Sequence, residues 1–134
     1  MDPIADMLVQ IKNTALTGRE EVVFPYSKFK HEVIKVLASK GYLENITKKM
    51  RRNRPYLSCY ISYLPAVPGT RPQARLSQIK KISKPSRRIY KKVSELRPTR
   101  QGYGLVVVST SKGLMAEEEA RKQKLGGEVI FQIW

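Results

Sequence analysis

Residues 101–115 read QGYGLVVVSTSKGLM, and the order of residue types in this stretch decides the architecture around it. The apolar run predicts a fully buried strand over residues 105–109. Three small hydroxyl residues at 109–111 then predict a loop that leads into Lys112 and Gly113. Hydroxyl groups both donate and accept hydrogen bonds, so such a loop suits base edges and ribose 2′-hydroxyls in a shallow RNA minor groove. The same composition is typical of an ordinary polar turn, and the pattern alone leaves both interpretations open.

The sequence on either side of this strand predicts a mainly antiparallel β lobe with a short helix. Apolar runs bounded by turn residues indicate further strands at residues 79–83 and 129–134. A helical turn is expected at 91–96 and a helix at 117–124.

The N-terminal part of the chain contains two helices with recognisable ends. Asp2 can cap the first helix with Pro3 at its first helical position, and apolar residues recur on one face until Gly18. Ser27 can cap the second helix, which Gly41 ends. Both helices are amphipathic, so each requires an apolar partner surface.

Strand-like runs alternate with these helices. A short strand is predicted at residues 21–24, and two longer strands at 42–47 and 56–64. The basic sequence KKMRRNR at 48–54 is expected to form the tip of the hairpin that joins the longer pair. The order α-β-α-β-β predicts a two-layer lobe in which the helices cover one face of the sheet.

The fold class is therefore expected to be α+β with two small lobes. The N-terminal lobe is predicted to span residues 1–64 and the C-terminal lobe residues 79–134. Residues 65–78 contain three prolines and one glycine and few apolar side chains, which is typical of a linker or an exposed loop.

The net charge of +15 is concentrated in the middle of the chain. Residues 1–47 contain six basic and six acidic side chains, and residues 101–134 contain four of each. Residues 48–100 contain sixteen basic side chains and a single acid, Glu95. A solvated basic face is the simplest interpretation of surface charge, but a block this dense indicates a polyanionic partner that exchanges its counterions for lysine and arginine.

Nucleic acid is favoured over an anionic membrane as that partner. The basic block is interrupted by prolines, among them those at positions 65, 68, 72, 85 and 98, so it cannot form one long amphipathic helix. The first twenty residues do not form a signal-peptide core, and no apolar run approaches the roughly 20 residues of a membrane span. The protein is expected in the cytoplasm and not at a membrane.

Residues suited to catalysis or metal binding are few. Cys59 is the only cysteine, which excludes an internal disulfide and fits a reducing compartment. His31 lies within a predicted helix, where a lone histidine is usually a packing or surface residue. Glu117–Glu119 fan around a helix and, as first-turn acids, suit its dipole better than they suit a metal ion. The sequence predicts no enzyme activity, no cofactor and no metal.

Three separated blocks resemble one known family. The closing run GYGLVVVSTSKGLMAEEEARKQKLGGEVIFQIW (102–134) is similar to the C-terminal motif of small-subunit ribosomal protein eight of the bacterial type. The opening DPIADMLVQIKNT (2–14) resembles the N-terminal motif of the same family, and KKISKPSRRIYKK (80–92) resembles its middle motif. Recognisable blocks are therefore spread over the whole chain.

This resemblance implies a two-lobed protein that binds the central domain of small-subunit ribosomal RNA early in assembly, beside neighbouring small-subunit ribosomal proteins. The second lobe would contact an internally bulged RNA helix through the hydroxyl loop. By motif position, the family's groove-contacting and loop-shaping residues correspond to Ser109, Thr110, Ser111, Lys112, Gly113, Gly102, Gly104 and Glu128.

The other two motifs carry further contacts by resemblance. Phosphate contacts and stacking on exposed nucleotides would fall to Lys84, Ser86, Arg87 and Tyr90. The first helix would touch RNA through Pro3, Asp6 and Asn13.

Three features depart from the family pattern. Ser86 stands where the family usually has glycine, Ala116 replaces a usual threonine before a helix, and residues 65–78 form a longer stretch than is typical. Ala116 removes an expected helix cap.

Two other functions remain open from the sequence. One is an RNA-processing enzyme in which Glu117–Glu119 bind a divalent ion. The other is translational control, because members of this family in some bacteria bind their own messenger RNA through a mimic of the ribosomal site.

Overall fold

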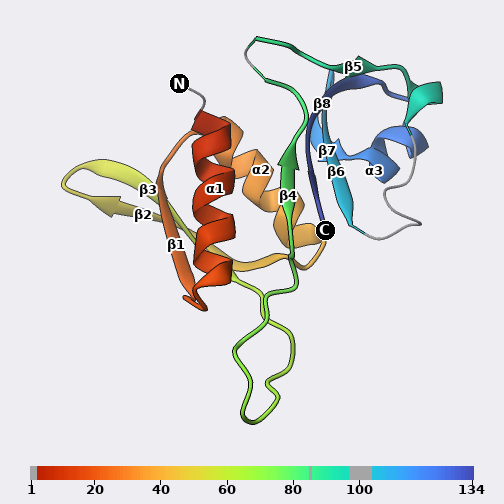
Figure 1. The fold of residues 1–134 in the computed structure, drawn as a ribbon. Helices are drawn as coiled ribbons and strands as arrows, with labels where there is room; N and C mark the ends of the chain where they lie inside the picture. The colour runs from red at the N-terminus through yellow and green to blue at the C-terminus, as the bar shows by residue number, and fades with distance from the viewer. Residues whose placement is uncertain (1–2, 85, 97–103) are drawn as a thin grey trace. The chain divides into compact units, whose positions relative to one another are not determined.

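The computed structural model describes residues 3–84, 86–96 and 104–134, which form two compact units, Pro3–Ser77 and Gln78–Trp134 (Figure 1). The α+β fold class predicted from the sequence is confirmed, with two helices and a three-stranded sheet in the first unit and a five-stranded sheet with a short helix in the second. No helix among the described residues is both long enough and apolar enough to cross a membrane.

The first unit has the predicted order α-β-α-β-β. Its elements are α1 (Pro3–Leu16), β1 (Glu21–Pro25), α2 (Lys28–Ser39), β2 (Leu43–Arg51) and β3 (Arg54–Ile61). The strands form an antiparallel sheet in the order β1-β3-β2, so β1 and β2 are its edges.

Local capping explains where α2 begins and ends. The Ser27 hydroxyl accepts a hydrogen bond from the Lys30 N–H at 3.1 Å, as predicted for an N-cap. At the other end, Gly41 has φ +84° and its N–H donates to the Ala38 carbonyl at 3.0 Å. The predicted cap of α1, Asp2, lies outside the described residues.

The core of the first unit lies between the helices and one face of the sheet. Side chains on a strand alternate between faces, and the apolar side chains on the inner face of β1 and β3 are buried. These sheet residues are Val22, Phe24, Leu57, Cys59 and Ile61. The helices bury their apolar stripes in the same core, through Met7, Leu8, Ile11, Val33, Ile34 and Leu37. Desolvation in this core raises the pKa of the Cys59 thiol to about 12, so Cys59 is a packing residue.

The hairpin between β2 and β3 is longer than the sequence predicted. Residues 48–54 were expected to form a loop, but β2 continues to Arg51 and β3 starts at Arg54. Only Arg52 and Asn53 form the turn, and both have positive φ, at 49° and 63°. The prediction failed because lysine and arginine are not typical strand residues, although cross-strand pairing extends through them.

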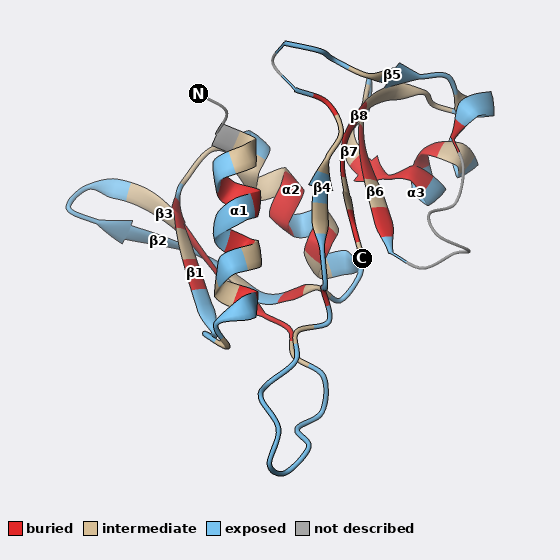
Figure 2. Ribbon diagram, in the orientation of Figure 1, coloured by how far each residue is buried: buried red, intermediate tan, exposed pale blue. Residues whose placement is uncertain are grey.

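Residues 65–77 form a long loop that belongs to the first unit. An isolated bridge joins Tyr63 to Ala74, and the Leu64 N–H donates to the Gln73 carbonyl at 2.8 Å. Residues 64–73 are exposed, as the pale blue loop in Figure 2 shows. The segment is thus a loop of the first unit, which ends at Ser77, and the second unit begins at Gln78.

The second unit contains one antiparallel sheet whose strands differ in length. Its elements are β4 (Ile79–Lys81), β5 (Tyr90–Lys91), the 3-10 turn η1 (Val93–Glu95), β6 (Leu105–Thr110), β7 (Gly113–Ala116), α3 (Glu117–Lys122) and β8 (Gly127–Ile133). The sheet order is β4-β8-β6-β7, and β5 also pairs with β8. The strands β5 and β7 were not predicted.

A small apolar cluster joins α3 to this sheet. Leu96, Val108, Met115 and Ala120 are buried together. The N-cap position of α3 is Ala116, whose side chain makes no capping hydrogen bond, as the sequence comparison with the family anticipated.

Candidate nucleic-acid interface

Three of the predicted RNA-binding residues lie in one row across the sheet of the second unit. Glu128 on β8 is the direct cross-strand partner of Tyr90 on β5 and of Ser109 on β6. Direct partners in an antiparallel pair project from the same face of a sheet, about 5 Å apart. Residues 38 positions apart in the sequence, such as Tyr90 and Glu128, are therefore brought together by strand pairing.

The residues of this row differ in exposure. Tyr90 is 69% exposed, so its ring is available for stacking. The Glu128 side chain is only 17% exposed and accepts a hydrogen bond from the Arg88 guanidinium at 3.3 Å. The row thus combines the exposed ring of Tyr90, the Glu128 carboxylate, which Arg88 holds in place, and the Ser109 hydroxyl.

The hydroxyl segment is a β-hairpin end, not the three-residue loop that was predicted. Ser109 and Thr110 belong to β6, and only Ser111 and Lys112 form the turn. The Thr110 hydroxyl donates to the Gly113 carbonyl at 2.9 Å and accepts from the Lys112 N–H at 3.2 Å. Thr110 therefore closes the turn, while Ser111 and Lys112 are exposed at its tip. Gly113, with φ +111°, provides the backbone conformation that lets β7 start immediately.

Two glycines that the sequence analysis did not single out allow the strands to approach. A Cβ on Gly127 would lie 2.1 Å from the Ser109 carbonyl oxygen, and a Cβ on Gly126 would lie 2.6 Å from the Lys91 carbonyl oxygen. Any larger residue would displace β5 or β6 from β8. The Gly-Gly pair in the sequence was the available indication, because paired glycines often mark close backbone contact.

The middle motif forms a tight turn beside this row. Lys84 and Arg87 exchange backbone hydrogen bonds of 2.9 and 3.0 Å, and Ser86 and Arg87 are exposed. The residue that fixes the turn is Ser83, which the sequence analysis missed. Ser83 is fully buried, and its hydroxyl accepts from the Ile89 N–H at 2.8 Å and donates to the Ile89 carbonyl at 3.3 Å.

The two predicted loop-shaping glycines are not both beside the hydroxyls. Gly104 lies just before Leu105, at the opposite end of β6 from Thr110. Its positive φ and a Cβ position only 2.5 Å from the Ile133 carbonyl oxygen show a close contact with the end of β8. Gly102 lies outside the described residues.

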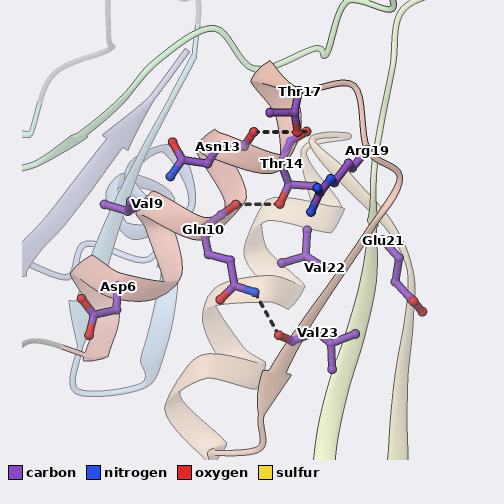
Figure 3. Close-up of a pocket in the computed structure, with 10 residues that line it drawn as sticks. All are labelled: Asp6, Val9, Gln10, Asn13, Thr14, Thr17, Arg19, Glu21, Val22 and Val23. Carbon is purple, nitrogen blue, oxygen red and sulfur yellow. Dashed lines mark hydrogen bonds between the residues drawn. The ribbon is translucent and has the colours of Figure 1, made fainter.

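Asp6 and Asn13 lie in the first unit, on the exposed side of α1. They line a surface hollow of about 610 Å³ between α1 and β1, together with Gln10, Thr14 and Arg19 (Figure 3). The Gln10 side-chain amide donates to the Val23 carbonyl at 3.1 Å, which ties the helix to the edge strand. Pro3 is the first residue of α1, and its side chain is not described.

The three consecutive acids of α3 are held by partners on the same helix. Glu117 is buried and accepts hydrogen bonds from Arg121 at 2.8 and 3.4 Å, and Glu119 accepts from Gln123 at 2.8 Å. Glu118 pairs with Lys122 at 3.6 Å. These pairings stabilise the helix and leave the carboxylates directed around it instead of toward one ion.

The family model and the curated relatives that match this chain agree on one family. The family model described as ribosomal protein S8 matches residues 2–134. The chain is 40% identical over 135 residues to the small ribosomal subunit protein uS8 of Thermus thermophilus, covering 99% of this chain and 98% of the relative. It is 38% identical over 133 residues to the uS8 proteins of Nitratiruptor sp. and Exiguobacterium sibiricum, again covering 99% of this chain. With matches of this length, the chain belongs to the ribosomal protein S8 family.

Proposed function

We propose that this protein is a structural constituent of the small ribosomal subunit that binds the central domain of small-subunit ribosomal RNA directly and supports its assembly. The observation that carries the proposal is the row of Tyr90, Glu128 and Ser109 across three strands, in a chain of the ribosomal protein S8 family. Its partners in the cytoplasmic ribosome are this RNA and neighbouring small-subunit proteins.

Specific recognition is assigned to the hydroxyl hairpin end. Ser109 and Ser111 present short donor and acceptor groups, and Thr110 holds the turn that displays them. Such groups match ribose 2′-hydroxyls and base edges in the wide minor groove of an RNA helix. Glu128, which Arg88 holds in place, accepts hydrogen bonds from base amino groups or 2′-hydroxyls beside them.

Positioning is assigned to the cationic and aromatic residues around the row. Lys84, Arg87 and Lys112 are exposed and neutralise phosphates, while the Tyr90 ring stacks on an unpaired nucleotide. Asp6 and Asn13 give the first unit its own contact, through the polar side of α1.

Enzyme activity is not part of the proposal. The alternative of an RNA-processing enzyme needed Glu117–Glu119 to bind a divalent ion, and each of these carboxylates is instead paired along its own helix. Membership of a ribosomal protein family agrees with a structural role.

A binding experiment tests the proposal. The full chain is titrated with a transcript of the internally bulged central-domain helix and with a control transcript in which the bulge is replaced by paired bases, at several salt concentrations. We expect preference for the bulged transcript and a linear fall of log affinity with log salt, by about 0.7 to 0.9 for each phosphate neutralised. Equal affinity for both transcripts, or affinity independent of salt, would contradict the proposal. The transcript should also stay intact during incubation with magnesium.

A further inference from the structure

The β2–β3 hairpin of the first unit presents a concentration of positive charge that the site above does not use. Five basic side chains occur within seven residues, and we call this set the basic hairpin: Lys48, Lys49, Arg51, Arg52 and Arg54. All five residues are exposed. In Figure 1 the hairpin extends beyond α1 and α2, so the helices of its own unit do not cover its tip.

Strand pairing places three of these residues on the face of the sheet opposite the helices. Lys49 contacts the Glu21 carboxylate at 3.4 Å, whereas Leu57 and Cys59 project into the helix-covered core. Two residues further along β2, Arg51 projects to the same side as Lys49, and Arg54 is its direct cross-strand partner.

Tyr56 extends this face toward the middle of the sheet, because it is the direct partner of Lys49. The uncovered face therefore has a partly exposed ring flanked by cations.

The carboxylates of the described residues neutralise only part of the positive charge of the basic hairpin. Glu21 is its one carboxylate contact among the described residues, and it also accepts a 2.6 Å hydrogen bond from Ser58. Over the same residues, Arg51, Arg52 and Arg54 form no ion pair. Like charges directly opposite each other destabilise a hairpin, as the pairing of Arg51 with Arg54 does here.

The turn itself adds a conformational cost. A two-residue turn with two positive φ values is best made by Asn-Gly, because glycine adopts this conformation without steric penalty. Here the first position is Arg52, with φ 49°, which brings a guanidinium to the outermost point of the hairpin. Both the turn and the Arg51–Arg54 pair are therefore less stable than uncharged alternatives of the same length.

We infer that the basic hairpin is a second RNA contact, which holds the sugar-phosphate backbone of the same RNA outside the specific site and does not read sequence. This inference rests on the function proposed above. Arginine is suited to phosphate because its planar guanidinium donates two parallel hydrogen bonds.

An acidic protein is the other partner that such charge could meet. The exposed, lysine- and arginine-dense hairpin lacks the apolar centre that stable protein interfaces require, since Met50 is the one exposed apolar side chain among residues 48–54. Phosphate backbone therefore fits the surface better.

The test compares three variants of the full chain. The first is the triple variant R51Q/R52Q/R54Q, which removes the unpaired charges of the basic hairpin. A charge-matched control, K28Q/K35Q/R71Q, removes three exposed cations elsewhere in the first unit. The third variant, N53G, keeps all five charges and relaxes the turn. Thermal unfolding of each variant checks that the fold is retained.

Each protein is titrated with two RNAs, the minimal bulged helix and a longer central-domain transcript that includes its flanking helices. On the longer RNA we expect R51Q/R52Q/R54Q to bind about tenfold or more weakly, and its salt slope to be smaller by about 2 to 3, which is about 0.7 to 0.9 for each phosphate contact removed. On the minimal helix it should match the unsubstituted chain. The charge-matched control and N53G should match the unsubstituted chain on both RNAs.

Three results would overturn the inference. Equal salt slopes for the triple variant and the unsubstituted chain on the longer RNA would show that the basic hairpin makes no phosphate contact. An equal loss in the charge-matched control would show that only net charge matters. If the triple variant bound both RNAs normally but failed to enter reconstituted small ribosomal subunits, the hairpin would be assigned to a protein partner. If the unsubstituted chain itself does not prefer the bulged helix, the proposed function fails, which is a separate outcome from failure at the hairpin.

Discussion

Ser109 and Glu128 are direct cross-strand partners, and the residue before Glu128 is a glycine whose Cβ position lies 2.1 Å from the Ser109 carbonyl oxygen. The proposed recognition residues are thus held by the pairing of β6 with β8, at a point where the two backbones approach closely. The geometry of the interface consequently depends on positions that present no side chain to RNA.

Gly127→Ala is expected to damage both stability and RNA binding. The added methyl would overlap backbone that cannot move aside without breaking the β6–β8 pairing, and overpacking typically costs about 1 to 3 kcal/mol, with a contact this close at the upper end. Chemical denaturation measures the loss in free energy of unfolding. Gly69→Ala is the control for adding a methyl where there is room, because nothing lies within 4 Å of the Gly69 Cβ position. Gly69 has φ +80°, unlike Gly127, so any loss in Gly69→Ala reflects backbone strain and not overlap. Similar losses in the two variants would contradict the close-approach argument.

Thr110 and Ser111 should differ in what their hydroxyls do. Thr110→Ala removes two hydrogen bonds that close the hairpin, so it should reduce the free energy of unfolding by about 1 to 2 kcal/mol. Ser111→Ala removes an exposed hydroxyl and should leave stability within about 0.5 kcal/mol while reducing discrimination for the bulged helix. The triple change of 109–111 to alanine should abolish discrimination and keep nonspecific RNA affinity. Unchanged discrimination in that variant would remove the hairpin end from the interface.

Ser83→Ala should weaken RNA binding although Ser83 is fully buried. The substitution leaves the Ile89 N–H without its partner in the protein interior, which costs about 1 to 3 kcal/mol, and it frees the turn that carries Lys84 and Arg87. Ser86→Ala, at an exposed position of the same turn, should not change stability measurably. Calorimetric unfolding and RNA titration of the pair distinguish a positioning residue from a contact residue, and equal stability of the two variants would refute this assignment.

Glu21 should make the stability of the first unit dependent on pH in the acid range. The hydrogen bond from Ser58 lowers the pKa of Glu21 below its ordinary value of 4.5, and the charges of Lys49 and Arg51 act in the same direction. A lowered pKa in the folded state means that the stabilisation is complete above about 4.5 and is lost as pH falls through the folded pKa. The difference in melting temperature between Glu21→Gln and the unsubstituted chain should therefore be largest near neutral pH and should shrink in acid.

Ser58→Ala provides the check on that cause. Without the hydroxyl, the pKa of Glu21 should rise toward its ordinary value, and the loss of stability in acid should become smaller, because the folded and unfolded pKa values then differ less. Titration of the Glu21 carboxyl by NMR measures this directly. An unchanged pKa in Ser58→Ala would show that the lysine and arginine, and not the hydroxyl, dominate.

The helices and the order of elements in the first unit could be predicted because their signals are local. The hydroxyl of Ser27 caps α2, and Gly41 follows its end in the left-handed conformation, as their positions in the sequence indicated. The buried residues of α2, which include Val33 and Leu37, follow helical spacing.

The strands that were missed depend on partners far away in the sequence. Tyr90 and Lys91 form a strand only because β8 pairs with them, and two residues give no periodicity of their own. The strand Gly113–Ala116 exists because the Thr110 hydroxyl closes a turn two residues long, which moved Ser109 and Thr110 from the expected loop into β6. Arg51 and Arg54 pair for a similar reason, since the core strands behind them set the register.

The resemblance named residues that strand pairing brings together in the candidate site, but it did not name the residues that support them. Motif resemblance pointed to Tyr90 and Glu128, and strand pairing makes them neighbours. Resemblance did not indicate the roles of Ser83 and Gly127, because a buried hydrogen bond and a close backbone contact are properties of packing. Only the three-dimensional structure reveals such supports.

The strand β8 pairs with β4, β5 and β6, so it is the common partner of three separate chain segments. If β8 detached from the sheet, Tyr90, Ser109 and Glu128 would no longer lie in one row, because β8 pairs with both β5 and β6. A copy of the protein in which this seven-residue strand has not yet paired consequently lacks the aligned row, so the proposed specific site would form only once β8 is in place.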